Sequence, residues 1–596
     1  MKKRLLVCAL LVLLAFGAHA PALRGGFVWD DTALILRDPL IRSWRLIPEQ
    51  FQHFLFTDAT PSNFYRPVQR ITYTFEYWAA IFQPALFHLT NILLHAGAAI
   101  ALFIFALALM RIYGVEGRRR ECVAILAAAA WALHPLHSAV VDYVSGRADS
   151  LAALFGFVGL YFCVRTLEAE GREAWRFHGC TGAAFLLSAL SKESGLIFCL
   201  AAFGLVVARR QWRTLRGLAI SLAFVVTIYG TLRVQAEVIE IPQMSAPIPF
   251  LVRPIIAARA LAEYAGLLVA PVRLHMDRDV ESHPAGMNNA SMTAVSMREL
   301  EGVAGCALVL LLGWWMLRAR RAEPAVFALL LLGAIFYAPV SGLLPLNASI
   351  AEHWLYVPSA FLLLAVALQL SRLRSQLLLR GVIVGSCLWM LALGGRSFVR
   401  AGDWNNQRTF LERNIAAGGD SARMLINLAA LEMSGNRLDL ASDLFRRALA
   451  REPGQPLASL NLAAVELRKN EFAAARADLA RATAHPATEA LAHNLRATLD
   501  YKEHAKLDLM RLRLATRTAP PNWSIERRYV RVLWDTGHRA AAIAELKGIL
   551  RTDAYRAESW QILAVYLVHS GHPKEGVDAL SLACDLDVHL GEHEQL

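Results

Sequence analysis

Two adjacent acidic residues, Asp30 and Asp31, follow the first apolar segment of the chain and carry the clearest potential for chemistry. A carboxylate can remove a proton from an attacking hydroxyl group. Because adjacent side chains of an extended segment point to opposite faces, one acid can address a reaction while the other holds local structure or a cation. The alternative is that the Asp-Asp-Thr-Ala run caps an interfacial helix, since Asp is a favoured N-cap residue. The residue types alone leave both roles open.

Cationic side chains recur in the other polar motifs of the chain. Arg66, Arg147 and Lys192 each interrupt or border an apolar stretch. Guanidinium and ammonium groups stabilise phosphate oxygens, Arg through a planar fork and Lys through a point charge. Their alternative role is to bind lipid headgroups or to pair with the nearby acids Asp149 and Glu193. The sequence favours neither role over the other.

Histidines and an acidic-aromatic motif complete the candidate residues. At the entrance to an apolar segment, a buried acid needs a partner and an aromatic ring can cover a lipid or a sugar, which singles out Glu352, His353 and Tyr356. Anchoring at a membrane interface is the alternative for Tyr356. His88 lies near the outer end of another apolar segment, where it can touch a ligand. His137 forms an i,i+3 pair with a second histidine, which is an incomplete metal site.

Long apolar segments must position these motifs. The chain is 56% hydrophobic with a mean hydropathy of +0.38, and apolar stretches of spanning length fill residues 1–397. We predict about eleven spans, with residues 251–273 as an interfacial or re-entrant helix. When the Arg-rich loops are assigned to the cytoplasm, every candidate motif lies on the opposite face. Ionisable groups beside hydrocarbon are costly, so their convergence on one face indicates a site.

Charge and cysteine content exclude two classes of function. The net charge of +12 comes largely from arginines in short loops between apolar segments, where it orients a membrane protein, and no nucleic-acid-binding motif accompanies it. We therefore expect no nucleic-acid partner. The eight cysteines form no CxxC pair, and most lie in or beside apolar segments. We expect neither structural disulfides nor a zinc site.

The C-terminal part of the chain is a helical repeat. Asn427-Leu428-Ala429 recurs 34 residues later as Asn461-Leu462-Ala463, which is the tetratricopeptide period, and alanines recur at matching positions. Weaker units begin near Glu489, Trp523 and Ala557. The predicted fold is all-α, a polytopic membrane helix bundle followed by a tetratricopeptide-repeat (TPR) α-solenoid. Its predicted parts are a membrane domain, residues 1–400, with an extracytoplasmic loop, 24–83; a junction, 401–420; and the repeat domain, 421–596.

Taken in order, the motifs resemble those of the transmembrane and tetratricopeptide-repeat O-mannosyltransferases and their bacterial relatives. The resemblance covers nearly the whole chain and rests on Phe27-Val28-Trp29-Asp30-Asp31, Tyr65-Arg66-Pro67, Phe87-His88-Leu89-Thr90-Asn91, His134-Pro135-Leu136-His137, Gly146-Arg147-Ala148-Asp149, Lys192-Glu193, Ala351-Glu352-His353-Trp354-Leu355-Tyr356-Val357-Pro358, Arg400 and Trp404-Asn405-Asn406. Two positions differ from the family pattern, with His353 in place of an Arg and Ser138 in place of an acid.

The resemblance implies a GT-C class glycosyltransferase. Such an enzyme moves a sugar, with inversion, from a polyprenyl-phosphate carrier to a Ser or Thr hydroxyl outside the cytoplasm. It implies that Asp30 or Asp31 is the catalytic base. The donor and its phosphate would be held by Arg66, Arg147, Lys192, Glu193, Glu352, His353 and Tyr356, and further substrate contacts would come from Tyr65, His88, His137 and Asp149. No metal ligand is assigned, and no motif supports a divalent cation.

The expected partners are membrane lipid, the lipid-linked sugar donor and an exported protein acceptor in the groove of the repeats. The expected location is the bacterial inner membrane, with the N-terminus in the cytoplasm and the repeats in the periplasm. One alternative is a non-catalytic membrane scaffold whose repeats recruit envelope proteins. Another is a lipid-carrier-dependent ligase or polymerase of envelope glycans. The scaffold does not explain the many spans or the acids on one face, since a single span anchors a domain.

Overall fold

The structure of the chain is a computed structural model that describes residues 2–56, 62–115, 117–236, 249–278, 292–344, 346, 348–505, 508–518 and 522–590. These residues are almost entirely helical, with one pair of short strands. They form two compact units. The first contains Met1–Val28, Pro84–Thr231 and Pro247–Asp420, and the second contains Trp29–Gln83, Leu232–Ala246 and Ser421–Leu596. The predicted all-α fold, a membrane helix bundle with a TPR solenoid, is confirmed.

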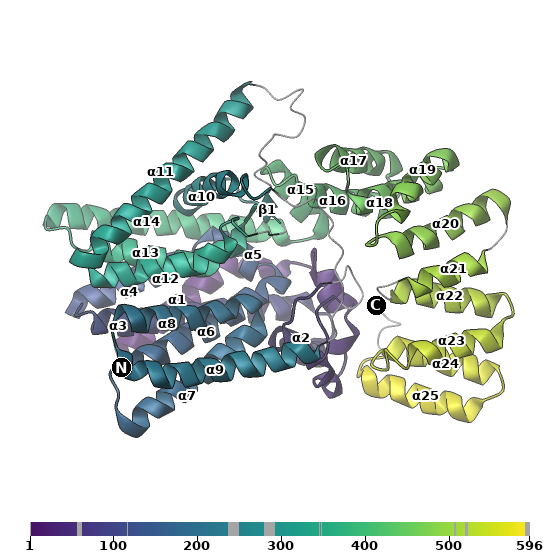
Figure 1. Ribbon diagram of the computed structural model, residues 1–596, viewed down its shortest axis with the longest axis horizontal. Coiled ribbons are helices and arrows are strands. Elements are labelled where there is room, and N and C mark those ends of the chain that lie inside the picture. Colours follow the sequence, from purple (N-terminus) through teal and green to yellow (C-terminus); the bar gives the residue numbers. More distant parts are fainter. Residues whose placement is uncertain are drawn as a thin grey trace. The chain divides into compact units, whose positions relative to one another are not determined.

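Long apolar helices make up the first unit (Figure 1). Their bounds are α1 Lys2–His19, α3 Pro84–Ile112, α4 Gly117–Ala132, α5 Ser138–Val141, α6 Arg147–Thr166, α7 Gly171–Ser191, α8 Ile197–Ala208, α9 Trp212–Gln235, α10 Arg253–Val269, α11 Met292–Ala322, α12 Pro324–Tyr337, α13 Tyr356–Leu370, α14 Gln376–Ala401 and α15 Gln407–Ala416. The apolar stretches that fill residues 1–397 are helical over these ranges.

Fewer of these helices than the expected eleven or so have the length and composition of a membrane span. Among the described residues, seven helices pass that test, or eight if the bent pair Gly117–Ala132 and Pro135–Val141 is one span. Two more apolar helices, Glu193–Ala208 and Pro324–Val340, are shorter. α7 is not among either group, because charged residues occupy its first two turns. The sequence therefore predicted the positions of the helices better than the number of membrane spans.

Glycines let the central helices of the first unit approach closely. α6 packs against α3 and α7 along much of its length (Figure 1). A Cβ atom on Gly156 would overlap the ring of Phe198, and one on Gly159 would overlap the ring of Phe185. Small residues are favoured between membrane helices because association in lipid depends on close packing. These two glycines therefore admit aromatic side chains from α7 and α8 against the backbone of α6.

The only strands within the described ranges form a two-residue ladder in the first unit. β1 (Asp277–Arg278) pairs antiparallel with β2 (Ile350–Ala351), with Asp277 opposite Ala351 and Arg278 opposite Ile350. The ladder joins the segment that follows α10 to the start of α13. It consequently fixes the backbone position immediately before Glu352.

The acids Asp30 and Asp31 lie in the second unit, in a segment of short turns that we call the acidic-pair segment (Trp29–Gln83). Its elements are η2 (Thr32–Leu36), which is π-helical, the 3₁₀ turns η3 (Pro39–Ile41), η4 (Trp44–Leu46) and η5 (Glu49–Phe51), and helix α2 (Pro67–Ala80). A buried ion pair holds them together, because Arg70 Nε lies 2.8 Å from Asp38 Oδ2 and Arg70 Nη2 donates to the Phe54 carbonyl. Asp38 also caps η3 by accepting from the Leu40 amide.

The repeats form five stacked helix pairs, coloured green to yellow in Figure 1. Their bounds are α16 Ala422–Ser434, α17 Leu438–Arg451, α18 Pro456–Arg468, α19 Phe472–Thr483, α20 Glu489–His504, α21 Leu509–Arg517, α22 Trp523–Asp535, α23 Arg539–Ile549, α24 Ala557–His569 and α25 Pro573–Leu586. The weaker units begin at Glu489, Trp523 and Ala557, as the sequence predicted. The recurring alanines Ala441 and Ala475 are fully buried between paired helices.

The turn inside a helix pair explains part of the sequence repeat. Asn436 and Asn470 have φ angles of +60° and +61°, and the corresponding glycines Gly537 and Gly571 have φ angles of +84° and +88°. Asn and Gly tolerate this left-handed conformation better than other residues. The repeated residue type is therefore a backbone requirement of the turn.

One buried acid of the second repeat lacks the partner that the first repeat provides. Glu432 and Glu466 occupy the same repeat position and are both buried, and Glu432 pairs with Arg437. In the second repeat Glu471 replaces that Arg, and Glu466 faces Asp478 instead. Burial, followed by the charge of Asp478, raises the pKa of Glu466 to about 7. The folded state thus binds a proton that the unfolded state releases, so this group destabilises the repeats as pH rises from about 4.5 to 7.

We predict that Glu466→Gln stabilises α18 and α19 at pH 8 and has little effect at pH 4.5, where the carboxyl is already protonated. Hydrogen–deuterium exchange of the intact protein should show their amides exchanging at least tenfold more slowly than in the wild type at pH 8. That lower bound uses about one pKa unit of the difference between 4.5 and about 7. The control is Glu432→Gln, which removes the partner of Arg437 and should accelerate exchange at pH 8. An equal effect of Glu466→Gln at both pH values would contradict the prediction.

Candidate functional site

A strained turn presents the two candidate acids. Trp29, immediately before them, has a φ angle of +53°, which an aromatic residue adopts only when its surroundings impose it. The Asp30 carbonyl accepts the amides of Ala33 and Leu34, which starts η2. Asp31 is fully buried at the N-cap position of η2, yet its side chain makes no capping hydrogen bond. Asp30 is partly exposed. The capping alternative therefore does not describe Asp31, and Asp30 is the more accessible carboxylate.

Tyr65 and Arg66 lie in the same segment as the acids and differ in exposure. Tyr65 is fully buried, and its hydroxyl donates to the Phe51 carbonyl over 2.9 Å, which ties the end of η5 to the start of α2. Arg66 is partly exposed, and its guanidinium lies 4.5 Å from the ring centre of Phe64. Tyr65 thus has a structural contact, whereas Arg66 keeps a charged group near the surface of this unit.

Arg147 is buried in the first unit and fastens α6 to α3. Its Nε donates to Asn91 Oδ1 over 2.7 Å, and its Nη2 donates to the Phe87 carbonyl over 2.8 Å. The preceding Gly146 is required here, because a Cβ atom would overlap the Ala139 carbonyl. Arg147 has no exposed surface, so a donor phosphate would have to reach it through this packing.

Lys192 pairs with an acid, which is one of the two roles that the sequence left open for it. Its Nζ lies 2.7 Å from each carboxylate oxygen of Asp149, and each side chain is 14% exposed. Lys192 has an extended backbone, with φ −157° and ψ 142°, and this break separates α7 from the 3₁₀ turn η8 (Glu193–Leu196). Glu193 opens that turn and is partly exposed. The result is a compact polar group at the end of an apolar helix.

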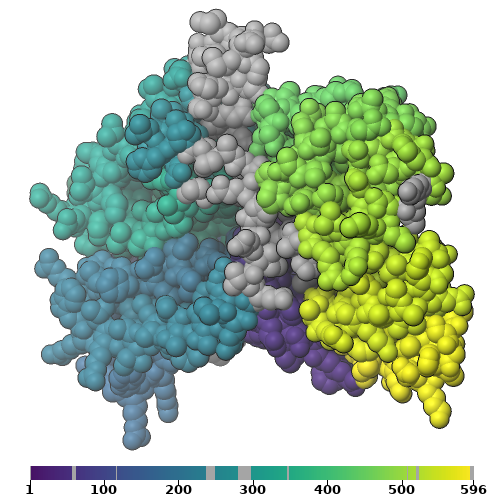
Figure 2. Space-filling model, turned by 45° about the vertical axis from the view of Figure 1, so that its right-hand side comes forward, coloured from purple at the N-terminus to yellow at the C-terminus, as the bar shows by residue number. Residues whose placement is uncertain are grey.

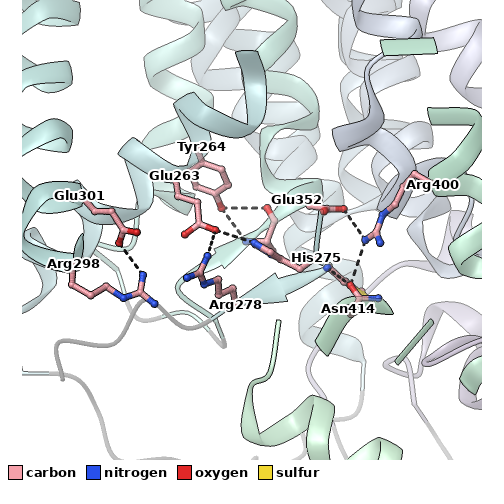
Figure 3. A network of polar contacts seen from close by, with 11 residues as sticks. Glu263, Tyr264, His275, Arg278, Arg298, Glu301, Glu352, Arg400 and Asn414 are labelled. Carbon is pink, nitrogen blue, oxygen red and sulfur yellow. Dashed lines mark hydrogen bonds and ion pairs between the residues drawn. The ribbon is translucent and has the colours of Figure 1, made fainter. Parts of the chain in front are cut away.

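Glu352 is completely buried and bound into a polar network (Figure 3). Its Oε2 lies 3.5 Å from Arg400 Nη2, and Arg400 also donates to Asp403 Oδ2 at 3.1 Å and to Asn414 Oδ1 at 3.3 Å. Asn414 Oδ1 in turn accepts the Met276 amide. This network joins the start of α13 to the end of α14 and to α15. His353 beside it is partly exposed and lies edge-on to Trp354.

A second part of the network involves residues that the sequence analysis missed. Glu263 Oε1 lies 2.9 Å from His275 Nε2 and 2.8 Å from Arg278 Nη1 (Figure 3). Burial by itself raises the pKa of Glu263, but the hydrogen bond from His275 and the charge of Arg278 outweigh it and leave the pKa below its usual value. Tyr264 donates to the Ala351 carbonyl and accepts the Ala351 amide. These residues support the strand pair ahead of Glu352.

The structure also pairs an acid that no motif indicated. His19 Nδ1, at the end of α1, lies 2.7 Å from Asp142 Oδ1, and both side chains are fully buried. Asp142 is the only acid in residues 133–148, which is the signal that could have found it. It lies one helical turn beyond Ser138, where the family pattern places an acid. Ser138 itself accepts a hydrogen bond from Trp404 Nε1 at 2.7 Å.

The remaining candidate aromatic and histidine residues lie inside the first unit. Tyr356 and His137 are fully buried; the Tyr356 hydroxyl lies 2.7 Å from His95 Nδ1, and His137 Nε2 lies 3.3 Å from Ser359 Oγ. His88 is 1% exposed, with Nε2 3.3 Å from the Gly26 carbonyl. Over the described part of the chain, no group of three His, Cys, Asp or Glu could hold a metal ion. The donor and substrate roles of all these residues stay predictions.

The sequence is similar to curated animal protein O-mannosyl-transferases. Identity to the protein F38B6.6 of Caenorhabditis elegans is 23% over 431 residues, covering 70% of this chain and 59% of the relative. Identity to TMTC3 of Homo sapiens is 22% over 73% of this chain and 50% of the relative, and to TMTC4 of Homo sapiens 31% over 26% and 22%. The chain thus spans about half the length of F38B6.6 and of TMTC3. The resemblance inferred from the motifs is confirmed.

No protein-family model matches the chain. Among solved structures, the TPR protein YrrB shares 19% identity over 31% of this chain and 98% of its own, with a TM-score of 0.21. Yeast Tom70 shares 12% identity over 82% of this chain and 94% of its own, with a TM-score of 0.28. These scores are too low to support an argument about this chain.

We predict that Lys192 and Asp149 are energetically coupled. Because each is largely buried, Lys192→Met or Asp149→Asn leaves its partner without a counter-charge and should lower the melting temperature of the detergent-purified protein by about 2–4 °C. The double variant should recover at least half of the summed loss, since neither group is then left unpaired. Losses that simply add in the double variant would show that the two side chains act independently.

Proposed function

We propose that this chain is an inverting membrane glycosyltransferase of the GT-C class, which transfers a sugar from a polyprenyl-phosphate carrier to a Ser or Thr hydroxyl of a protein. The similarity to protein O-mannosyl-transferases over 70% of the chain supports the class of reaction. The observation that carries the proposal is the acidic pair: one carboxylate partly exposed and one buried, directly after a residue in a strained conformation. Such strain recurs at functional sites.

In the proposed reaction, Asp30 removes the proton from the acceptor hydroxyl as its oxygen attacks the anomeric carbon of the sugar. The new carbon–oxygen bond forms as the bond to the carrier phosphate breaks, and the phosphate leaves with the electron pair. A single displacement of this kind inverts the anomeric configuration. Asp30 is the proposed base because it is partly exposed, whereas Asp31 is fully buried.

The leaving phosphate gains negative charge, so the proposed reaction needs cations. Arg66, Arg147 and Lys192 are the proposed donor contacts, supported by Glu193, Glu352, His353 and Tyr356. Of the three cations, Arg66 and Lys192 have exposed surface, whereas Arg147 is fully enclosed. Within the first unit, we therefore propose that Lys192 contacts the phosphate and that Arg147 positions α3 and α6; Arg66 stays a donor contact inferred from the motifs alone.

We predict that Asp30→Asn lowers kcat for sugar transfer by at least about 100-fold with little change in the donor KM, because the amide keeps the shape but cannot accept the proton. Asp31→Asn should lower kcat less, because Asp31 is fully buried and does not reach the acceptor. The measurement is transfer from polyprenyl-phosphate sugars to peptides by the full-length protein in liposomes. Asp439→Asn, at an acid that is 94% exposed in the repeats, is the matched control and should retain full activity. Unchanged transfer by both Asp30 and Asp31 variants would reject the base assignment.

We also propose that the protein lies in a bacterial inner membrane with its N-terminus in the cytoplasm and its repeats outside, where they bind the protein acceptor. Alkaline phosphatase fused after Leu596 should then be active, because that enzyme folds only outside the cytoplasm. The matched control is a fusion after Arg321, within an Arg-rich loop expected inside, which should be inactive. An inactive fusion at Leu596 would contradict the proposed orientation.

A further inference from the structure

The acidic-pair segment belongs to the same compact unit as the repeats. Its turns η2 to η5 are each three to five residues long. Helical turns of that length are not stable by themselves, since nucleation costs more free energy than one or two hydrogen bonds return. The conformation around Asp30 and Asp31 therefore depends on what the segment packs against.

The end of the last repeat makes a buried hydrogen bond with this segment. The Tyr77 hydroxyl donates to Asp587 Oδ1 over 2.7 Å, and Tyr77 is fully buried while Asp587 is 6% exposed. The His589 amide donates to the same oxygen, and its ring lies edge-on to Tyr77 with ring centres 5.3 Å apart. Burial raises the pKa of Tyr77 well above its usual range, so the hydroxyl remains a donor at every physiological pH.

Arg42 connects this contact to the turn that carries the acids. Its guanidinium lies 4.8 Å from the ring centre of Tyr77, and its Nη2 donates to the carbonyl of Leu36, the last residue of η2. The Arg42 carbonyl accepts the Val588 amide at 3.3 Å. A continuous series of contacts therefore runs from Asp587 through Tyr77 and Arg42 to the C-terminal end of η2. Asp31 is the N-cap of that same turn.

Apolar packing reinforces the contact. Leu40 and Leu46 form a buried cluster with Tyr555, against which Leu586 of α25 packs. The ring of His53 also lies edge-on to Tyr555, with ring centres 4.9 Å apart. Figure 2 shows the purple N-terminal residues beside the yellow C-terminal helices, in agreement with these contacts. At the opposite end of the solenoid, the Arg423 guanidinium of α16 lies 5.6 Å from the ring centre of Trp29.

We propose that the last repeat is a positioning element for the acidic pair, acting through Asp587, Tyr77 and Arg42 on η2. The three residues are positioning residues and touch no reacting atom. The repeats would then set the alignment of Asp30 as well as bind an acceptor, so that release of α25 from the segment lowers catalysis. The catalytic part of this inference rests on the proposed glycosyl transfer, whereas the structural part does not.

The test uses Asp587→Ala and Tyr77→Phe in the full-length protein. The first removes the acceptor of the buried hydrogen bond and the second removes its donor. Hydrogen–deuterium exchange of residues 30–37 should accelerate at least fivefold, while exchange in α16 to α19 stays unchanged. In transfer to a short peptide, kcat should fall about tenfold with the donor KM unchanged, since the base is displaced but the donor site is intact. Asp578→Ala, at an exposed acid of α25, is the matched control and should leave both readouts unchanged.

Unchanged exchange of residues 30–37 in both variants would overturn the proposal, and so would acceleration spread evenly through the repeats, which would show general destabilisation. Accelerated exchange with unchanged kcat in an active protein would overturn the catalytic part. If the wild-type protein transfers no sugar from any polyprenyl-phosphate donor, the proposed function fails, and the exchange measurement still decides whether α25 holds the segment.

Discussion

Polar groups among apolar helices must find partners inside the protein, because hydrocarbon offers none. The first unit is organised around this constraint. His19 pairs with Asp142, Arg147 with Asn91 and the Phe87 carbonyl, Lys192 with Asp149, and Glu352 with Arg400. Each pair joins two elements that are distant in the chain. The polar side chains that mark the candidate site therefore also determine which helices meet around it.

The same constraint separates the candidate residues by what they can still bind. A fully enclosed group such as Arg147 or Tyr356 already satisfies its hydrogen bonds within the protein, and reaching a ligand would cost it those contacts. A partly exposed group such as Arg66 or Asp30 has solvent-accessible surface that a substrate can contact. Exposure, rather than residue type, thus divides the residues that hold the fold from those available to a substrate.

Close packing plays a comparable part in the repeats, where alanines such as Ala475 admit the neighbouring helix and asparagines such as Asn470 close the turn. Here the pairs are local, and the same contacts recur along the solenoid. The exception is the end of the last repeat, where Tyr77 and Asp587 join residues 510 positions apart. The repeats thereby gain long-range contacts that the repeat period does not contain.

The sequence by itself determined the helical fold, the repeat register and the candidate acids. The length of apolar stretches indicates where membrane helices lie. The 34-residue period predicted the first residues of repeat units, such as Trp523 and Ala557. These signals are local, because helix formation and turn conformation depend on residues within a few positions of one another. Span counting was weaker, since α7 is helical but too polar over its first turns to count as a span.

Only the tertiary structure decided the pairing. Nothing in the residues around Asp142 indicates His19, which lies 123 positions away, and nothing around the acidic pair indicates that α25 packs against its segment. Burial likewise distinguished Asp31 from Asp30, although the two are adjacent and of one type. The physical reason is that periodicity reports which face of a helix is apolar, whereas partner choice depends on where distant elements meet once the chain has folded.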